Sequence, residues 1–88
     1  MTKYIALLDG KPGTYDVSIP DCPGCVTMGG SEQNAVENGR AALSQRMKNL
    51  APGKSERPIP STGETLRKDP NVTAALAGGA IFVIVEAE

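Results

Sequence analysis

Alternating apolar and polar residues predict three strands in the first third of the chain. Residues 3–8 (KYIALL) are mostly apolar and are followed by turn-forming residues at 9–13. Residues 14–19 (TYDVSI) alternate strictly, which is typical of a half-buried strand. These two strands are expected to form a β-hairpin with a five-residue loop. A third strand is expected over 25–28, after a turn at 20–24.

Apolar residues spaced three and four apart then predict one main helix, from about Glu32 to Leu50. Ser31 is a favourable N-cap, and Pro52-Gly53 ends the helix. A glycine inside a helix costs about 1 kcal/mol relative to alanine, so Gly39 predicts a close approach to a strand. The apolar face, which should lie on the sheet, contains Val36, Gly39, Leu43, Met47 and Leu50.

The last third of the chain predicts two short helices and one strand. A capping box at 61–64 (STGE) indicates a helical turn through Lys68. Asp69-Pro70 indicates a second helix start, with Gly78-Gly79 as its stop. Residues 80–86 (AIFVIVE) are rich in β-branched side chains and apolar on both faces, as expected of a buried strand.

The element order β-β-β-α-(short helices)-β predicts a single α+β domain over residues 1–88. A long helical crossover favours a last strand that runs parallel to an earlier one, and the natural place is beside the first strand. We therefore expect a mixed four-stranded sheet with the main helix on one face.

The second face of this sheet has no obvious cover. If Ile81, Val83 and Val85 point toward the main helix, Phe82 and Ile84 point away from it. An uncovered apolar patch usually marks an interface. We expect a homo-oligomer (dimer or tetramer) or a protein partner on the face of Phe82 and Ile84. The alternative is that the two short helices fold back over this face.

Composition argues against several kinds of partner. The net charge is −1 and the pI is near 5.4, without the basic stripe expected of a nucleic-acid-binding surface. Two Tyr, one Phe and no Trp offer little base stacking. The N-terminus lacks the apolar region of a signal peptide, and no apolar run is long enough to span a membrane. We therefore expect a cytoplasmic protein with reduced thiols and no membrane partner.

One motif invites a chemical interpretation, Cys22-Pro-Gly-Cys25. A thioredoxin-like pair needs its first cysteine at a helix N-terminus, but this pair lies between strands. A zinc site usually needs four ligands, so two cysteines without any histidine require sharing across a dimer. The simplest interpretation is small apolar residues packed at a turn. The carboxylates are scattered and a histidine base is missing, so we predict no catalytic residue, cofactor or metal site.

The stretch 14–43 resembles the core signature of the HicB-type antitoxin family. The segment Pro58-Ile59-Pro60-Ser61 and the apolar last strand also fit the family pattern. At position 22 the family typically has Leu, so Cys25 is the family's cysteine and Cys22 replaces an apolar residue. The matching positions are Tyr15, Val17, Pro20, Asp21, Pro23, Gly24, Cys25, Thr27, Gly29, Ser31 and Ala35.

The resemblance implies a partial ribonuclease-H-like fold and an antitoxin, not an enzyme. Family members bind a small HicA-type toxin, a ribonuclease that cleaves messenger RNA, and mask its catalytic face. Many members carry a C-terminal DNA-binding domain, which we do not expect within residues 1–88, so no direct DNA binding is expected from this chain. The alternatives are an orphan HicB-like oligomeric domain with another partner, and a redox or zinc protein that uses Cys22 and Cys25.

Within the signature, a structural role and toxin contact both stay open. Asp21 is the best candidate for toxin contact, because an acidic surface can compete for the basic surface of an RNA-binding toxin. A structural role is also plausible for it, because Asp in a turn often accepts hydrogen bonds from nearby backbone amides. Pro20, Pro23 and Gly24 are expected to fix the geometry of the turn.

Overall fold

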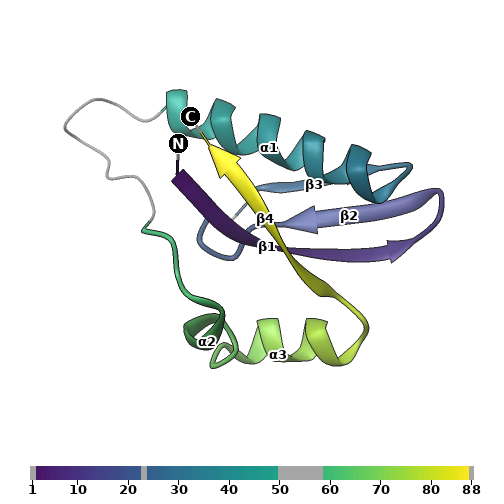
Figure 1. Ribbon diagram of the computed structural model, residues 1–88, viewed down its shortest axis with the longest axis vertical. Coiled ribbons are helices and arrows are strands. Elements are labelled where there is room, and N and C mark those ends of the chain that lie inside the picture. The colour runs from purple at the N-terminus through teal and green to yellow at the C-terminus, as the bar shows by residue number, and fades with distance from the viewer. Residues whose placement is uncertain (1, 23, 50–58, 88) are drawn as a thin grey trace.

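The computed structural model describes residues 2–22, 24–49 and 59–87, which form a four-stranded sheet with helices on both faces (Figure 1). The α+β class and the predicted order of elements are confirmed. The strands are β1 (Thr2–Lys11), β2 (Thr14–Ser18), β3 (Val26–Gly29) and β4 (Ile81–Ala87). The helices are α1 (Glu32–Lys48), α2 (Gly63–Leu66) and α3 (Pro70–Ala77).

All neighbouring strands are antiparallel, in the order β3-β2-β1-β4. The predicted place of the last strand beside the first is confirmed, with pairing from Thr2↔Ala87 to Leu8↔Ile81. The predicted mixed sheet is wrong, because β4 runs antiparallel to β1. Figure 1 shows why: α1 crosses one face of the sheet in one direction, and α3 crosses the other face in the opposite direction. This second crossing reverses the chain once more before β4 begins.

The β1–β2 hairpin is tighter than predicted. Pairing continues to Lys11↔Thr14, which leaves a loop of Pro12 and Gly13 in place of the expected five-residue loop. Gly13 has a φ of 94°, a positive value of the kind that two-residue hairpin loops need. Backbone pairing therefore extends β1 into residues 9–11, whose composition favours a turn.

Helix α1 begins where the sequence predicts. Ser31 Oγ accepts a hydrogen bond from Asn34 N at 3.1 Å and caps the helix. The helix ends at Lys48, whereas the predicted last residue, Leu50, lies outside the described residues. Its buried residues are Ala35, Gly39, Leu43 and Met47.

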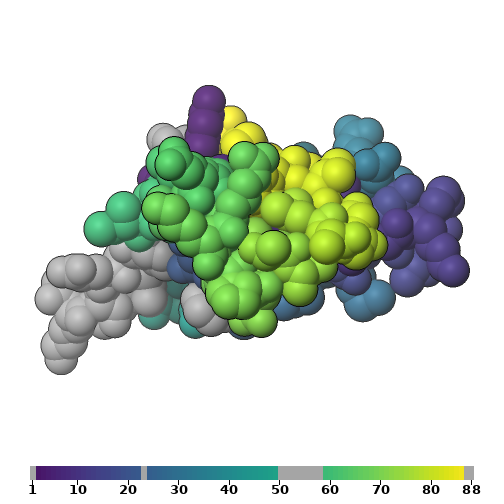
Figure 2. All heavy atoms as spheres, turned by 90° about the horizontal axis from the view of Figure 1, so that it is seen from below, coloured from purple at the N-terminus to yellow at the C-terminus, as the bar shows by residue number. Residues whose placement is uncertain are grey.

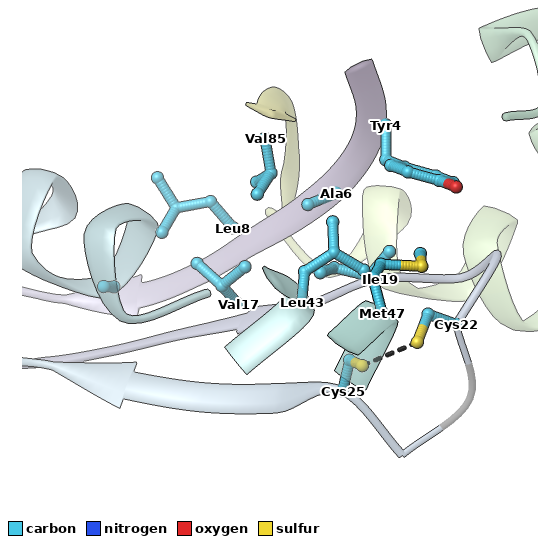
Figure 3. Packing of buried hydrophobic residues seen from close by; sticks show 11 residues of the cluster. Tyr4, Ala6, Leu8, Val17, Ile19, Cys22, Cys25, Leu43, Met47 and Val85 are labelled. Atoms are coloured by element: carbon cyan, nitrogen blue, oxygen red, sulfur yellow. Dashed lines mark hydrogen bonds between the residues drawn. The ribbon is translucent and has the colours of Figure 1, made fainter. Parts of the chain in front are cut away.

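Helix α1 and the first face of the sheet enclose the main hydrophobic core (Figure 3). Gly39 lies directly against β2, because a Cβ atom at this position would be 2.9 Å from Val17 Cγ1. The predicted close approach is thus confirmed. The buried residues of this core are Tyr4, Ala6, Leu8, Val17, Ile19, Cys22, Cys25, Ala35, Leu43, Met47 and Val85.

Helices α2 and α3 pack on the second face and occupy its middle (Figure 2). The N-cap of α2 is Thr62, one residue later than the capping box suggested. Asp69 caps α3 and Pro70 opens it, as predicted. The smaller core beneath these helices contains Leu7, Leu66, Val72 and Ala80, with Ile5, Ala75, Leu76 and Phe82 packed against it. The short helices therefore do fold back over part of this face.

Candidate functional site

The signature residues Pro20, Asp21, Gly24 and Cys25 lie in the turn between β2 and β3, which backbone hydrogen bonds close. Ile19 N donates to Cys25 O at 3.1 Å, and Cys25 N donates to Cys22 O at 3.0 Å. Gly24 has a φ of 92°, the conformation that a type II turn requires at its third position. Turn geometry therefore accounts for Gly24, whereas Pro23 lies outside the described residues.

Asp21 joins this turn to a segment 40 residues further along the chain. Its Oδ2 accepts a hydrogen bond from Ser61 N at 2.7 Å, and its Oδ1 accepts one from Ser61 Oγ at 2.6 Å. Ser61 immediately precedes Thr62, the N-cap of α2. Both carboxylate oxygens of Asp21 thus hold the start of α2 against the turn, and we call this contact the Asp21–Ser61 clamp.

Cys22 and Cys25 lie in the main core, and Figure 3 shows their sulfur atoms pointing toward one another. The Sγ atoms are 2.6 Å apart, and both cysteines are free thiols. Burial, reinforced by the hydrogen bond with Cys25, raises the pKa of Cys22 from 9.0 to about 11. A catalytic thiol needs a lowered pKa. The contacts of the pair therefore agree with small apolar residues packed at a turn.

The remaining predicted residues lie on different parts of the sheet. Tyr15 is half-buried and packs against the main core, on the α1 side. Pro20 is half-buried at the start of the turn. Phe82 is half-buried in the smaller core, whereas Ile84 is 54% exposed. The structure thus separates the signature turn from the residues proposed for an oligomer face.

A groove of about 430 Å³ lies on the second face of the sheet, between α3 and the β2–β3 turn. Its lining is mainly apolar, with Asp69 and Asn71 contributed by the start of α3. The apolar lining includes Leu7, Ile19, Pro20, Val26, Val72 and Ala75. The groove is therefore the concave part of a face that α2 and α3 cover only in part.

Exposed apolar and acidic residues continue this face beyond the groove. Val26 and Met28 on β3 are 61% and 62% exposed. The strand register places Asp16 opposite Met28 and Asp9 opposite Asp16, so these side chains share one face of the sheet. Asp9 and Asp16 are exposed as well. We refer to Asp9, Asp16, Val26 and Met28 together as the β3 surface.

The sequence does not indicate the partner of Asp21 or the exposure of Val26 and Met28 on the β3 surface. The pairing with Ser61 joins two distant segments, and no local pattern predicts it. The side to which the β3 residues point is given by a contact of Thr27 in the structure. Thr27 Oγ1 donates to Ala35 O of α1 at 3.5 Å, so its neighbours Val26 and Met28 must point to the opposite face.

The described part of the chain provides little for metal or membrane chemistry. Its residues include no group of three or more His, Cys, Asp or Glu placed to hold a metal ion. None of its helices combines the length and the apolar character that crossing a membrane requires. The features that could serve a function are therefore the groove, the β3 surface and the signature turn.

Comparison with known proteins identifies relatives of the whole chain. Residues 4–87 match the model of a family described as the HicB-like antitoxin of bacterial toxin–antitoxin systems. A search of curated proteins found no match.

Solved structures with the same fold include two structures of one antitoxin and one chain from a toxin–antitoxin complex. The antitoxin HicB of Burkholderia pseudomallei is 26% identical, with a TM-score of 0.78 over 98% of this chain and 63% of that one. This chain therefore spans less than two-thirds of that antitoxin. The isolated N-terminal domain of the same HicB is 24% identical, with a TM-score of 0.77 over 99% of each chain. A chain from a HicA3–HicB3 toxin–antitoxin complex is 20% identical, with a TM-score of 0.73 over 99% of each chain.

Proposed function

The chain belongs to the HicB-like antitoxin family, and from this membership we propose that it binds and masks a small HicA-type toxin that cleaves messenger RNA. The observation that carries the proposal is the family match over residues 4–87, nearly the whole chain. The similar fold of a chain from a HicA3–HicB3 complex supports it. The proposed role is that of a binding protein without catalytic activity of its own. Because its toxin would act on messenger RNA, we propose that it works in the cytoplasm.

We place the toxin contact on the β3 surface and the adjoining groove. Val26 and Met28 expose apolar side chains, and the mainly apolar groove lies beside them. Asp9 and Asp16 supply negative charge on the same face. A toxin that grips RNA needs basic surface, and complementary charge favours association with the right partner.

The signature turn then acts mainly by shaping this face. Cys25 is buried in the main core, and Asp21 uses both carboxylate oxygens within the chain. Pro20 lines the groove and Gly24 sets the turn. We therefore propose that the signature positions the groove walls, and that most of the toxin contact comes from residues outside the signature. With a net charge of −1, direct DNA binding by this chain is not part of the proposal.

Co-expression with the product of the neighbouring gene tests this function. The expected result is a stable complex by size-exclusion chromatography with light scattering, in which RNA cleavage by the partner is suppressed. Absence of a complex, or a complex that cleaves RNA freely, would favour an orphan HicB-like domain with another partner.

A matched pair of variants tests the proposed contact surface. Met28→Lys places a positive charge on the β3 surface and should weaken the complex by about tenfold or more. Ala41→Lys places the same charge on the exposed outer side of α1 and should leave the affinity unchanged. If both variants bind the partner equally well, the β3 surface is not the contact surface. This result would not contradict the antitoxin function itself.

A further inference from the structure

Cys22 and Cys25 have the geometry of a pair that can close a covalent bond. The hydrogen bond from Cys25 N to Cys22 O, at 3.0 Å, makes them the ends of one tight turn. The ends of such a turn have Cα atoms less than about 7 Å apart, which overlaps the range that disulfides use. The Sγ atoms are 2.6 Å apart, only about 0.6 Å more than a disulfide bond length.

Both cysteines are buried, but Cys25, at 6% exposure, borders two cavities. Cys25 lines the groove and also a second cavity of about 260 Å³, which Arg46 and Asn49 of the α1 end help to form. Cys22 is 2% exposed and does not line either cavity. An incoming oxidant therefore meets Cys25 first, and Cys22 lies directly behind it.

We propose that Cys22 and Cys25 are a reversible dithiol–disulfide site, oxidised within one chain by a low-molecular-weight disulfide such as oxidised glutathione. The Cys25 thiolate attacks the oxidant, forms a mixed disulfide and releases one thiol. The Cys22 thiol then loses its proton and attacks Cys25 Sγ, which releases the second thiol. In total, two protein thiols are oxidised to one disulfide, and one small disulfide is reduced to two thiols.

The raised pKa of Cys22 slows its attack on the mixed disulfide, but it does not make the resulting disulfide a strong oxidant. Active-site disulfides that are strongly oxidising owe this to a stabilised thiolate in the reduced form. Here burial raises the pKa of Cys22 to about 11, so a Cys22 thiolate does not stabilise the reduced form. Because Cys22 directly follows Asp21, the bond would tie the Asp21–Ser61 clamp to a covalently closed turn. The site does not require toxin binding, although Cys25 also lines the groove in which the toxin contact is proposed.

The test is incubation of the folded, reduced chain with oxidised glutathione, followed by alkylation of the remaining thiols with N-ethylmaleimide and intact-mass analysis. The expected product is a monomer lighter by about 2 Da that takes up no alkylating agent. Dithiothreitol should restore both thiols. Cys22→Ala and Cys25→Ala are the matched controls, and neither can form the internal bond. Cys25→Ala should also react more slowly than Cys22→Ala, since its remaining thiol is the less accessible one.

Any of four results would overturn the proposal. The wild-type chain could retain two alkylatable thiols, stop at a mixed disulfide with glutathione, or form disulfide-linked dimers. A parallel incubation in denaturing urea shows whether the folded geometry matters. If the internal disulfide forms faster in urea than in the folded chain, the native turn hinders the bond and the proposal fails.

Discussion

At the scale of single residues, the Asp21–Ser61 clamp shows how one carboxylate can organise two distant segments. Asp21 accepts hydrogen bonds from both the backbone amide and the hydroxyl of Ser61. Hydrogen bonds to charged groups contribute about 1.5–3 kcal/mol each, more than bonds between neutral groups. The sequence suggested Asp21 as a toxin contact. Its two hydrogen bonds with Ser61 give a sufficient structural reason for an aspartate at this position.

Asp21→Asn should destabilise the chain by about 1–3 kcal/mol, because its amide group can replace only one of the two acceptor oxygens. The measurement is the midpoint of urea unfolding at constant m-value. Asp16→Asn removes the same charge from an exposed site without a clamp, and should change stability by less than about 0.5 kcal/mol. Equal effects of the two substitutions would contradict the clamp.

The raised pKa of Cys22 predicts that the folded chain loses stability at alkaline pH. Its pKa is raised from 9.0 to about 11 by burial and by the neighbouring Cys25, against a lowering effect of Arg46. The folded state therefore holds the Cys22 proton more tightly than the unfolded state. This contribution to stability is fully present below pH 9.0 and is lost as pH rises toward 11.

The matched comparison is the unfolding free energy of the reduced wild type and of Cys22→Ala, measured between pH 8 and 11. The wild type should lose about 1–3 kcal/mol more than the variant over this range, because folding raises the pKa of Cys22 from 9.0 to about 11. Parallel pH profiles for the two proteins would show that Cys22 titrates alike in both states.

At the scale of elements, local patterns predicted which segments form helices and strands better than how they pair. The alternation of residues 14–19 and the cap at Ser31 are local signals, and both elements formed as expected. The direction of β4 depends on how often the chain crosses the sheet, which includes the path of α3 on the second face. The Asp21–Ser61 clamp depends on the same long-range path, so no local pattern indicates it.

Gly39 is the element-scale feature that the sequence did reveal, and it predicts an unfavourable alanine substitution. Alanine would favour the helix by about 1 kcal/mol, but its Cβ would lie 2.9 Å from Val17 Cγ1. Overpacking of this kind costs about 1–3 kcal/mol. We expect Gly39→Ala to lower stability in the wild type and to be neutral or stabilising beside Val17→Ala. A double-mutant cycle measures this coupling, and strictly additive effects would contradict it.

At the scale of the whole molecule, the two faces of the sheet differ in how completely they are covered. Helix α1 encloses the first face in the main core, whereas α2 and α3 cover only part of the second (Figures 1 and 2). Two exposed regions flank these short helices, namely the β3 surface and Ile84 on β4. The sequence predicted an apolar interface on this face. It could not predict that the exposed area is split into two regions, because the split depends on where α2 and α3 pack.

The position of Ile84 at a sheet edge predicts self-association of the isolated chain. β4 is the last strand in the sheet order, and Ile84 is 54% exposed on the side of α2 and α3. An exposed apolar edge strand favours pairing with another copy. Ile84→Lys should weaken the dimer or tetramer by about tenfold or more, as measured by light scattering over a concentration series.

Ile81→Lys is the matched control, since Ile81 is 50% exposed on the same strand but lies on the opposite face. If the wild type is monomeric throughout the series, Ile84 does not mediate self-association, and its exposed face would bind a different protein. If both variants dissociate the oligomer equally, the strand edge rather than the face of Ile84 holds the copies together.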